Sequence, residues 1–101
     1  MRKTKIICTL GPSTDSPEIL QAMMENGMDV ARFNFSHGSH DEHKRRLEEL
    51  KALRKKLNLP VAALLDTKGP EIRLGVFEEG AVVLQPGARF ILTPEQVPGT
   101  V

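Results

Sequence analysis

Three short stretches of the chain carry the residue patterns of β-strands. The stretch from Lys5 to Leu10 is a short apolar run that stops at Gly11, and Val61–Leu65 is a run of five apolar residues. Continuous apolar runs of this length are typical of strands that are buried on both faces of a parallel sheet. We therefore expect a buried strand at each of these two places.

The stretch Met28–Phe35 alternates instead, which predicts a strand with two different faces. One face would carry Ala31, Phe33 and Phe35. The other would carry Val30, Arg32, Asn34 and Ser36, a polar set that could either meet solvent or line a site.

Helical spacing fills the two segments between these strands. The pair Ser16-Pro17 is a typical helix start and Gly27 a typical stop, with apolar residues between them at positions 19, 20, 23 and 24. A capping box at Ser39–Glu42 predicts the start of a second helix, which Pro60 would end. Its apolar stripe is Leu47, Leu50, Leu53 and Leu57. The order strand, helix, strand, helix, strand predicts a βαβαβ unit of the α/β class.

Charged residues on the second helix predict two ion pairs on its exposed face. Asp41 precedes Arg45 by four positions, and Glu42 precedes Arg46 by four. Acid-before-base pairs at this spacing are neighbours on a helix surface.

The pattern changes after Arg73. The turn pairs Glu79-Gly80 and Pro86-Gly87 punctuate β-like runs over 81–84 and 88–92. This spacing predicts small antiparallel hairpins. We place a domain boundary near Pro70.

Composition narrows the class of function. In 101 residues, 14 Lys and Arg nearly cancel 13 Asp and Glu, whereas nucleic-acid and membrane-surface binders concentrate basic charge. The lone Cys8 excludes an internal disulfide framework and favours a reducing compartment. No apolar run approaches the ~20 residues of a membrane span. We therefore expect a cytoplasmic protein that binds neither nucleic acid nor membranes.

Candidate chemistry gathers where the predicted parallel strands end, which is where sites form in α/β folds. Arg32 and Arg73 offer guanidinium forks for phosphate or carboxylate, and His37 could donate a hydrogen bond to a phosphate. Oxygen donors suited to a hard cation come from Asn34, Ser36, Asp66 and Thr67. Cationic forks beside such a set suit phosphoryl transfer.

Ordinary structural roles could also explain each of these residues. Arg32 could be an ion-pair partner, Asn34 and Ser36 could close a turn, and Asp66 could cap a helix or begin an Asx turn. A second alternative is a zinc site, because His37, His40 and His43 are spaced three apart. The phosphate-binding motifs of P-loop and Rossmann proteins are absent from the sequence.

Three motifs, in order, resemble the N-terminal part of the pyruvate kinase family: Lys3–Ser13, Ala31–Gly38 and Leu65–Arg73. Phe33 stands where that family more often has Leu or Met. The resemblance implies the first three βα units of a (β/α)8 TIM barrel over residues 1–70. It also implies that residues 71–101 begin a small β-rich lid domain inserted into the barrel.

The resemblance further implies transfer of phosphate from phosphoenolpyruvate to ADP, giving pyruvate and ATP in the last step of glycolysis. Arg32 would contact phosphoenolpyruvate, and Asn34, Phe35, Ser36, His37 and Arg73 would contact the nucleotide. Potassium would be held by Asn34, Ser36, Asp66 and Thr67. Glu71 resembles the residue of potassium-dependent members.

Other parts of the family's machinery have no counterpart in these 101 residues. The ligands of Mg²⁺ or Mn²⁺ and the catalytic lysine would lie downstream. We therefore expect the chain alone to be inactive, within a parent that is a homo-oligomer. The alternative is a stand-alone small α/β phosphate-binding or interaction module.

Overall fold

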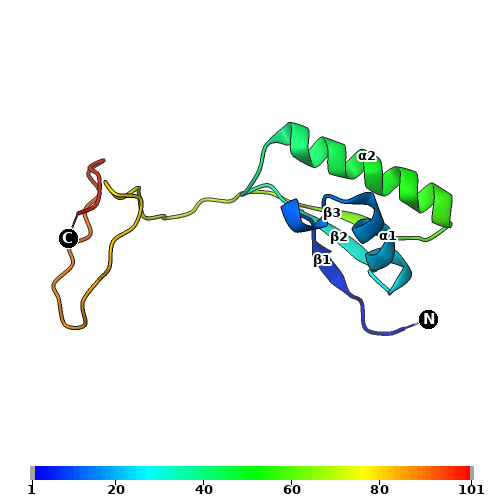
Figure 1. Ribbon diagram of the computed structural model, residues 1–101, viewed down its shortest axis with the longest axis horizontal. Coiled ribbons are helices and arrows are strands. Elements are labelled where there is room, and N and C mark those ends of the chain that lie inside the picture. The colour runs from blue at the N-terminus through cyan, green and yellow to red at the C-terminus, as the bar shows by residue number, and fades with distance from the viewer. Residues whose placement is uncertain (1, 101) are drawn as a thin grey trace. The chain divides into compact units, whose positions relative to one another are not determined.

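Parallel strands joined by helices make up the first of two units in the computed structural model, which describes residues 2–100. This unit ends at Gly69, and the second begins at Pro70. The first unit contains, in chain order, β1 (Ile7–Thr9), a 3-10 turn (Pro12–Thr14), α1 (Pro17–Glu25), β2 (Val30–Asn34), α2 (His40–Leu57) and β3 (Ala62–Asp66) (Figure 1).

The sheet is parallel throughout and has the order β1-β2-β3. Val30 lies between Ile7 and Ala62, and Arg32 lies between Thr9 and Leu64. Successive crossovers in one direction place both helices on the same face of a sheet. The structure confirms the predicted α/β arrangement.

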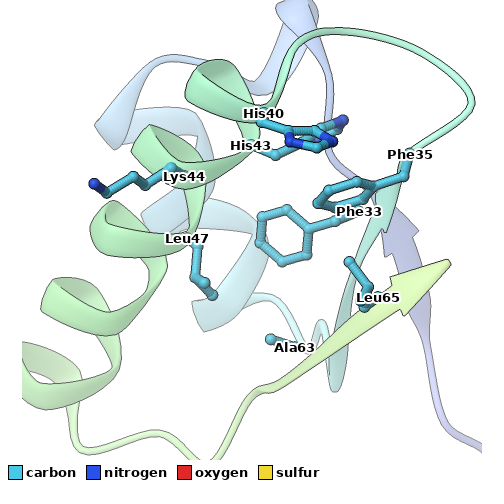
Figure 2. A pocket seen from close by; sticks show the side chains of 8 residues that line it. All are labelled: Phe33, Phe35, His40, His43, Lys44, Leu47, Ala63 and Leu65. Atoms are coloured by element: carbon cyan, nitrogen blue, oxygen red, sulfur yellow. The ribbon is translucent and has the colours of Figure 1, made fainter. Parts of the chain in front are cut away.

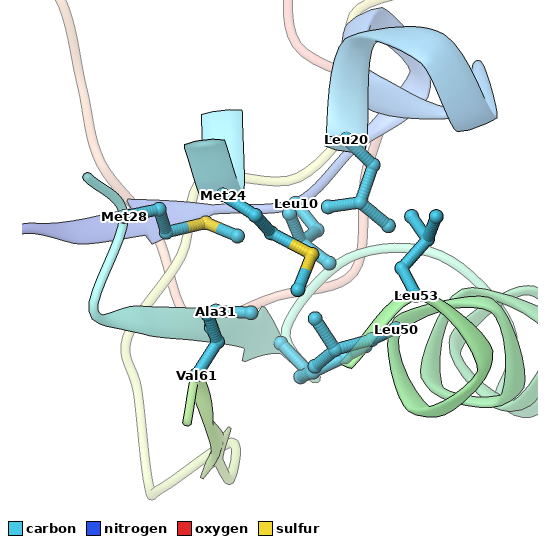
Figure 3. Packing of buried hydrophobic residues seen from close by; sticks show 9 residues of the cluster. Leu10, Leu20, Met24, Met28, Ala31, Leu50, Leu53 and Val61 are labelled. Atoms are coloured by element: carbon cyan, nitrogen blue, oxygen red, sulfur yellow. The ribbon is translucent and has the colours of Figure 1, made fainter. Parts of the chain in front are cut away.

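The core forms between that face and the two helices (Figure 3). Ala31 of β2 is fully buried, and so are Leu20 of α1 and Leu50 of α2. Leu53 extends the contact, as the predicted stripe of α2 requires. Because side chains alternate along a strand, burial of Ala31 and Phe33 fixes which face of β2 the helices cover.

The helices begin and end close to their predicted signals, except that α2 ends at Leu57, before the predicted stop at Pro60. The Ser39 N–H donates to Glu42 Oε2 at 2.7 Å, and the Glu42 N–H donates to Ser39 Oγ at 3.3 Å, so the capping box is confirmed. α2 ends before Pro60, because Asn58 adopts the left-handed conformation (φ 53°) that terminates it. Within residues 2–100, no helix is both long and apolar enough to cross a membrane.

The prediction that β1 and β3 are buried on both faces is wrong. Ile7 is 56% exposed and Leu65 is 61% exposed. Ile7 lies on the face opposite the helices, which nothing covers within residues 2–69. Leu65 pairs with Phe33 and lies on the helix face, but β3 is an edge strand and the helices leave its end largely exposed. An apolar run indicates that a strand can be buried. How much of it is buried depends on the elements that pack against it, which the run itself does not specify.

The prediction of antiparallel hairpins after Arg73 is also wrong. Among residues 70–100 the structure shows one isolated parallel bridge, between Phe77 and Gly99, and no strand at 81–84 or 88–92. The apolar side chains there, such as Val83 and Ile91, are mostly exposed. A two-stranded ribbon without a packing partner is only marginally stable, which accounts for the difference.

The ion pairs of α2 differ from prediction too. Arg45 and Arg46 both reach Asp15, which follows the 3-10 turn. Arg46 is only 5% exposed and forms a two-point contact, Nε to Oδ1 at 2.5 Å and Nη2 to Oδ2 at 2.8 Å. These hydrogen bonds from Arg46, aided by its charge and that of Arg45, hold the pKa of Asp15 below its ordinary value.

We predict that Asp15→Asn destabilises the first unit, because it removes the carboxylate charge that accepts both hydrogen bonds of the buried Arg46 guanidinium. The free energy of unfolding should fall by about 1.5–3 kcal/mol at pH 7, the range for hydrogen bonds to charged groups. A lowered pKa means that the Asp15 contribution is present at neutral pH and is lost on acidification. The difference between variant and parent in urea unfolding should therefore shrink below about pH 4.

The matched control is Asp41→Asn on the exposed first turn of α2. We expect it to cost less than about 1 kcal/mol, the usual size of a surface dipole effect. If the difference for Asp15→Asn persisted undiminished at acidic pH, the charge-based explanation would be contradicted.

Candidate functional site

The sheet face opposite the helices carries the polar side chains of the three strands. The pairing places these residues in rows that run from the amino to the carboxyl ends of the strands: Ile7, Val30 and Ala62, then Thr9, Arg32 and Leu64, then Asn34 and Asp66. The chemistry therefore concentrates at the carboxyl edge of the sheet, where sites in parallel α/β folds form.

Arg32 occupies the middle of this face and makes three side-chain hydrogen bonds. Nε and Nη2 donate to Asp66 Oδ2 at 2.9 and 2.5 Å, and Nη1 donates to Thr9 Oγ1 at 2.9 Å. Contacts on three nitrogens fix the plane of the guanidinium. Both bonds to Asp66 end on one oxygen, so Arg32 does not engage the Oδ1 atom.

The ion pair between Arg32 and Asp66 is partly exposed, at 31% and 43% of the two side chains. Pairs with this exposure contribute little to stability, typically ~0–1 kcal/mol. Arg32 is therefore an ion-pair partner, as the structural alternative proposed. The pair adds so little to the free energy of unfolding that stability alone does not explain an arginine at this position.

A tight turn follows β2 and brings its residues to the end of β3. The Ser36 N–H donates to Asn34 Oδ1 at 3.1 Å, and the His37 N–H donates to the Asn34 carbonyl at 3.2 Å. The Phe35 N–H donates to the Asp66 carbonyl at 2.9 Å. Asn34 therefore does close a turn, and the same turn seats it beside Asp66.

The structure thus brings together three of the residues proposed from the sequence, Arg32, Asn34 and Asp66. Ser36 lies in the adjoining turn, and Thr67 follows β3 directly. The donor atoms available from Asn34, Ser36, Asp66 and Thr67 are carboxylate, amide, hydroxyl and carbonyl oxygens. This chemistry fits a hard cation.

The side chain of Phe35 does not join this group. The Phe35 ring lies on the helix face of the sheet, stacked on His43 with the ring centroids 4.4 Å apart. Only the Phe35 backbone belongs to the turn. Arg73 is in the second unit, where its Nε donates to Glu71 Oε2 at 2.6 Å.

A cavity of about 400 Å³ lies on the helix face, between α2 and the ends of β2 and β3 (Figure 2). Its lining is mostly apolar and aromatic: Phe33, Phe35, His40, His43, Lys44, Leu47, Ala63 and Leu65. The burial of His43 was missed by reasoning from the sequence. Position 43 lies one turn before Leu47 and extends the apolar stripe, which was the available signal.

The zinc alternative is not supported. Among residues 2–100, no three His, Cys, Asp or Glu side chains gather in a way that could hold a metal ion. His43 directs Nε2 to the His37 carbonyl at 2.7 Å, and the His40 ring packs on Phe35. The rings of His40 and His43 instead pack against one aromatic side chain, that of Phe35, and the His37 side chain is exposed.

Comparison with known proteins identifies the family. The family model described as pyruvate kinase, barrel domain, matches residues 1–100. The chain belongs to the pyruvate kinase family. It corresponds to an N-terminal portion of pyruvate kinase, so the resemblance in the three sequence motifs is confirmed.

Pyruvate kinases of two bacteria illustrate the similarity. The chain is 51% identical to the Staphylococcus epidermidis protein over 100 residues, which is 99% of the chain and 17% of that protein. It is 51% identical to the Chlamydia muridarum protein over 98 residues, or 97% of the chain and 20% of that protein. The chain therefore spans about a fifth of the length of these pyruvate kinases.

A solved structure agrees. The crystal structure of Cryptosporidium parvum pyruvate kinase superimposes with a TM-score of 0.70 and 48% identity, covering 79% of this chain and 17% of that one. The parallel α/β arrangement is thus the barrel-domain fold of pyruvate kinase.

We predict that Asp66→Asn changes the free energy of unfolding of the first unit by less than about 1 kcal/mol, because the ion pair with Arg32 is partly exposed. Urea unfolding under the conditions used for Asp15→Asn provides the comparison. A loss for Asp66→Asn as large as that for Asp15→Asn would show that the Arg32–Asp66 pair serves stability.

Proposed function

We propose that the protein to which this chain contributes transfers the phosphoryl group of phosphoenolpyruvate to ADP, yielding pyruvate and ATP as the final step of glycolysis. Membership of the pyruvate kinase family supports this reaction. The observation that carries it is the position of Arg32, which lies at the carboxyl edge of a parallel sheet beside Asn34 and Asp66.

In this proposal, residues 1–70 supply the first three βα units of a (β/α)8 barrel, and residues 71–101 begin the inserted lid domain. The run of parallel neighbours β1, β2 and β3 with both helices on one face supports this placement. The uncovered sheet face, which carries Arg32, would then face the interior of the barrel.

Arg32 is proposed to bind the phosphoryl group of phosphoenolpyruvate. Its planar fork suits two phosphoryl oxygens, and the contact with Thr9 Oγ1 supports its orientation. Binding a phosphate through Nε and Nη2 would replace the contact with Asp66. Because that exposed pair contributes little free energy, the exchange would have a small cost.

The nucleotide's phosphates are assigned to the turn Asn34, Phe35, Ser36 and His37, together with Arg73. Phe35 would contribute through its backbone, since its ring packs against His43. The exposed His37 side chain at the end of the turn leaves a ring nitrogen available to a phosphate oxygen.

Potassium would be held by Asn34, Ser36, Asp66 and Thr67, whose oxygens match its preference. When bound there, the ion supplies positive charge that offsets the phosphates. Asp66 Oδ1, which Arg32 does not use, is the atom best placed to serve it. The presence of Glu71 supports potassium dependence, because it resembles the residue that potassium-dependent members of the family carry at this position. Mg²⁺ or Mn²⁺ would be bound by residues outside this chain.

The remaining machinery is proposed to lie outside these 101 residues, in a cytoplasmic homo-oligomer. The lysine that stabilises the transferred phosphoryl group is among the missing parts, and Lys68 does not replace it. The chain on its own would therefore not turn over phosphoenolpyruvate.

We predict that residues 1–100 of this chain, joined to the remainder of the Staphylococcus epidermidis pyruvate kinase in place of its matching segment, give an active kinase. In this hybrid enzyme, Arg32→Ala should lower kcat/KM for phosphoenolpyruvate by roughly 10²–10³-fold, the scale of removing one preorganised charge-stabilising donor. Arg32→Lys should also lose activity, because a lysine has no planar fork. A lactate dehydrogenase-coupled assay measures both.

The matched control is Arg89→Ala, which removes an exposed arginine of the second unit and should leave activity unchanged. The isolated 101-residue chain should show no turnover. Full activity of the Arg32→Ala hybrid, or potassium-dependent turnover by the isolated chain, would overturn the assignment.

A further inference from the structure

His43 has an environment that packing alone does not explain. It lies on α2 and is only 4% exposed. Its ring stacks on Phe35 with an interplanar angle of 16°, and it meets Phe33 edge-on with centroids 6.3 Å apart (Figure 2). A phenylalanine could make both aromatic contacts.

The hydrogen bonds of His43 show what the imidazole adds. Nε2 lies 2.7 Å from the His37 carbonyl oxygen, and since that oxygen can only accept, Nε2 carries a hydrogen. The other nitrogen, Nδ1, is buried and has no hydrogen-bond partner among the described residues. An unpartnered buried nitrogen is unfavourable, so the bond to His37 is the gain that sets this histidine apart from an apolar side chain.

The His37 carbonyl belongs to the loop that connects β2 to α2. Gly38 has a positive φ of 75°, and a Cβ added there would lie 3.1 Å from Glu42 Oε2 and 3.5 Å from His43 Nε2. The loop is therefore seated on the first turn of α2. The reciprocal bonds of the Ser39–Glu42 capping box hold it there, and the one from the Ser39 N–H also lowers the pKa of Glu42. The bond between the His37 carbonyl and His43 adds a further contact.

We propose that His43 is a positioning residue for nucleotide binding, acting through the backbone of the Asn34–His37 turn. It touches no substrate itself. Its Nε2–H fixes the carbonyl that ends the turn, and its ring supports Phe35 from the opposite face of the sheet. This inference rests on the proposed function, in which the turn contacts the phosphates of ADP.

The test uses two variants in the hybrid kinase. His43→Phe keeps an aromatic ring on Phe35 and removes the donor. His43→Gln restores an N–H donor near the position of Nε2 and removes the ring. We expect His43→Phe to raise the KM for ADP roughly five- to ten-fold, as for loss of one hydrogen bond. The KM for phosphoenolpyruvate should rise less than the KM for ADP, because Arg32 lies on β2 before the turn. His43→Gln should recover most of the loss.

Hydrogen exchange measured by mass spectrometry on the peptide covering residues 34–39 provides a readout independent of activity. In His43→Phe, exchange in this peptide should rise, while the peptide around Leu50 keeps its protection. Unchanged exchange at 34–39 would overturn the inference, and so would equal changes in the two KM values. Faster exchange with an unchanged KM for ADP would overturn the assignment of the nucleotide to the turn and, with it, the role of His43 in binding.

Discussion

One-sided packing of two helices on β2 determines the rest of the first unit. Ala31 and Phe33 turn toward α1 and α2 and are buried, so Arg32 and Asn34 must turn the other way. The face that holds the fold together and the face that carries the candidate chemistry are thus the two sides of one five-residue strand. A shift of one residue in β2 would exchange them, which is why the register and the site depend on each other.

Two arginines show how burial separates structural from chemical roles. Arg46 is almost fully buried on a two-point contact with Asp15, whereas the contact of Arg32 with Asp66 is partly exposed. The first pair joins α2 to the segment after β1. The Arg32–Asp66 pair orients the Arg32 guanidinium but contributes little free energy, so a phosphate could replace Asp66 at small cost.

Local patterns predicted the elements of the first unit well. The capping box at Ser39, the stripe through Leu50 and Leu53, and the alternation about Arg32 all rest on contacts within a few residues, which a sequence displays directly. The failures involve distant partners. Arg46 pairs with Asp15, 31 residues away, rather than with Glu42. The burial of β1 and β3 depends on which other elements pack against them, and the local sequence of each strand does not contain that information.

We propose that the carboxyl edge of this sheet holds an anion on Arg32 beside a monovalent cation. Anomalous diffraction from crystals of the hybrid kinase grown with rubidium and phosphoenolpyruvate would locate both, since rubidium reports the potassium position. We expect a rubidium peak among the oxygens of Asn34, Ser36, Asp66 and Thr67, with the substrate phosphate on the Arg32 guanidinium. Rubidium bound elsewhere, or a phosphate that leaves Arg32 paired with Asp66, would contradict it.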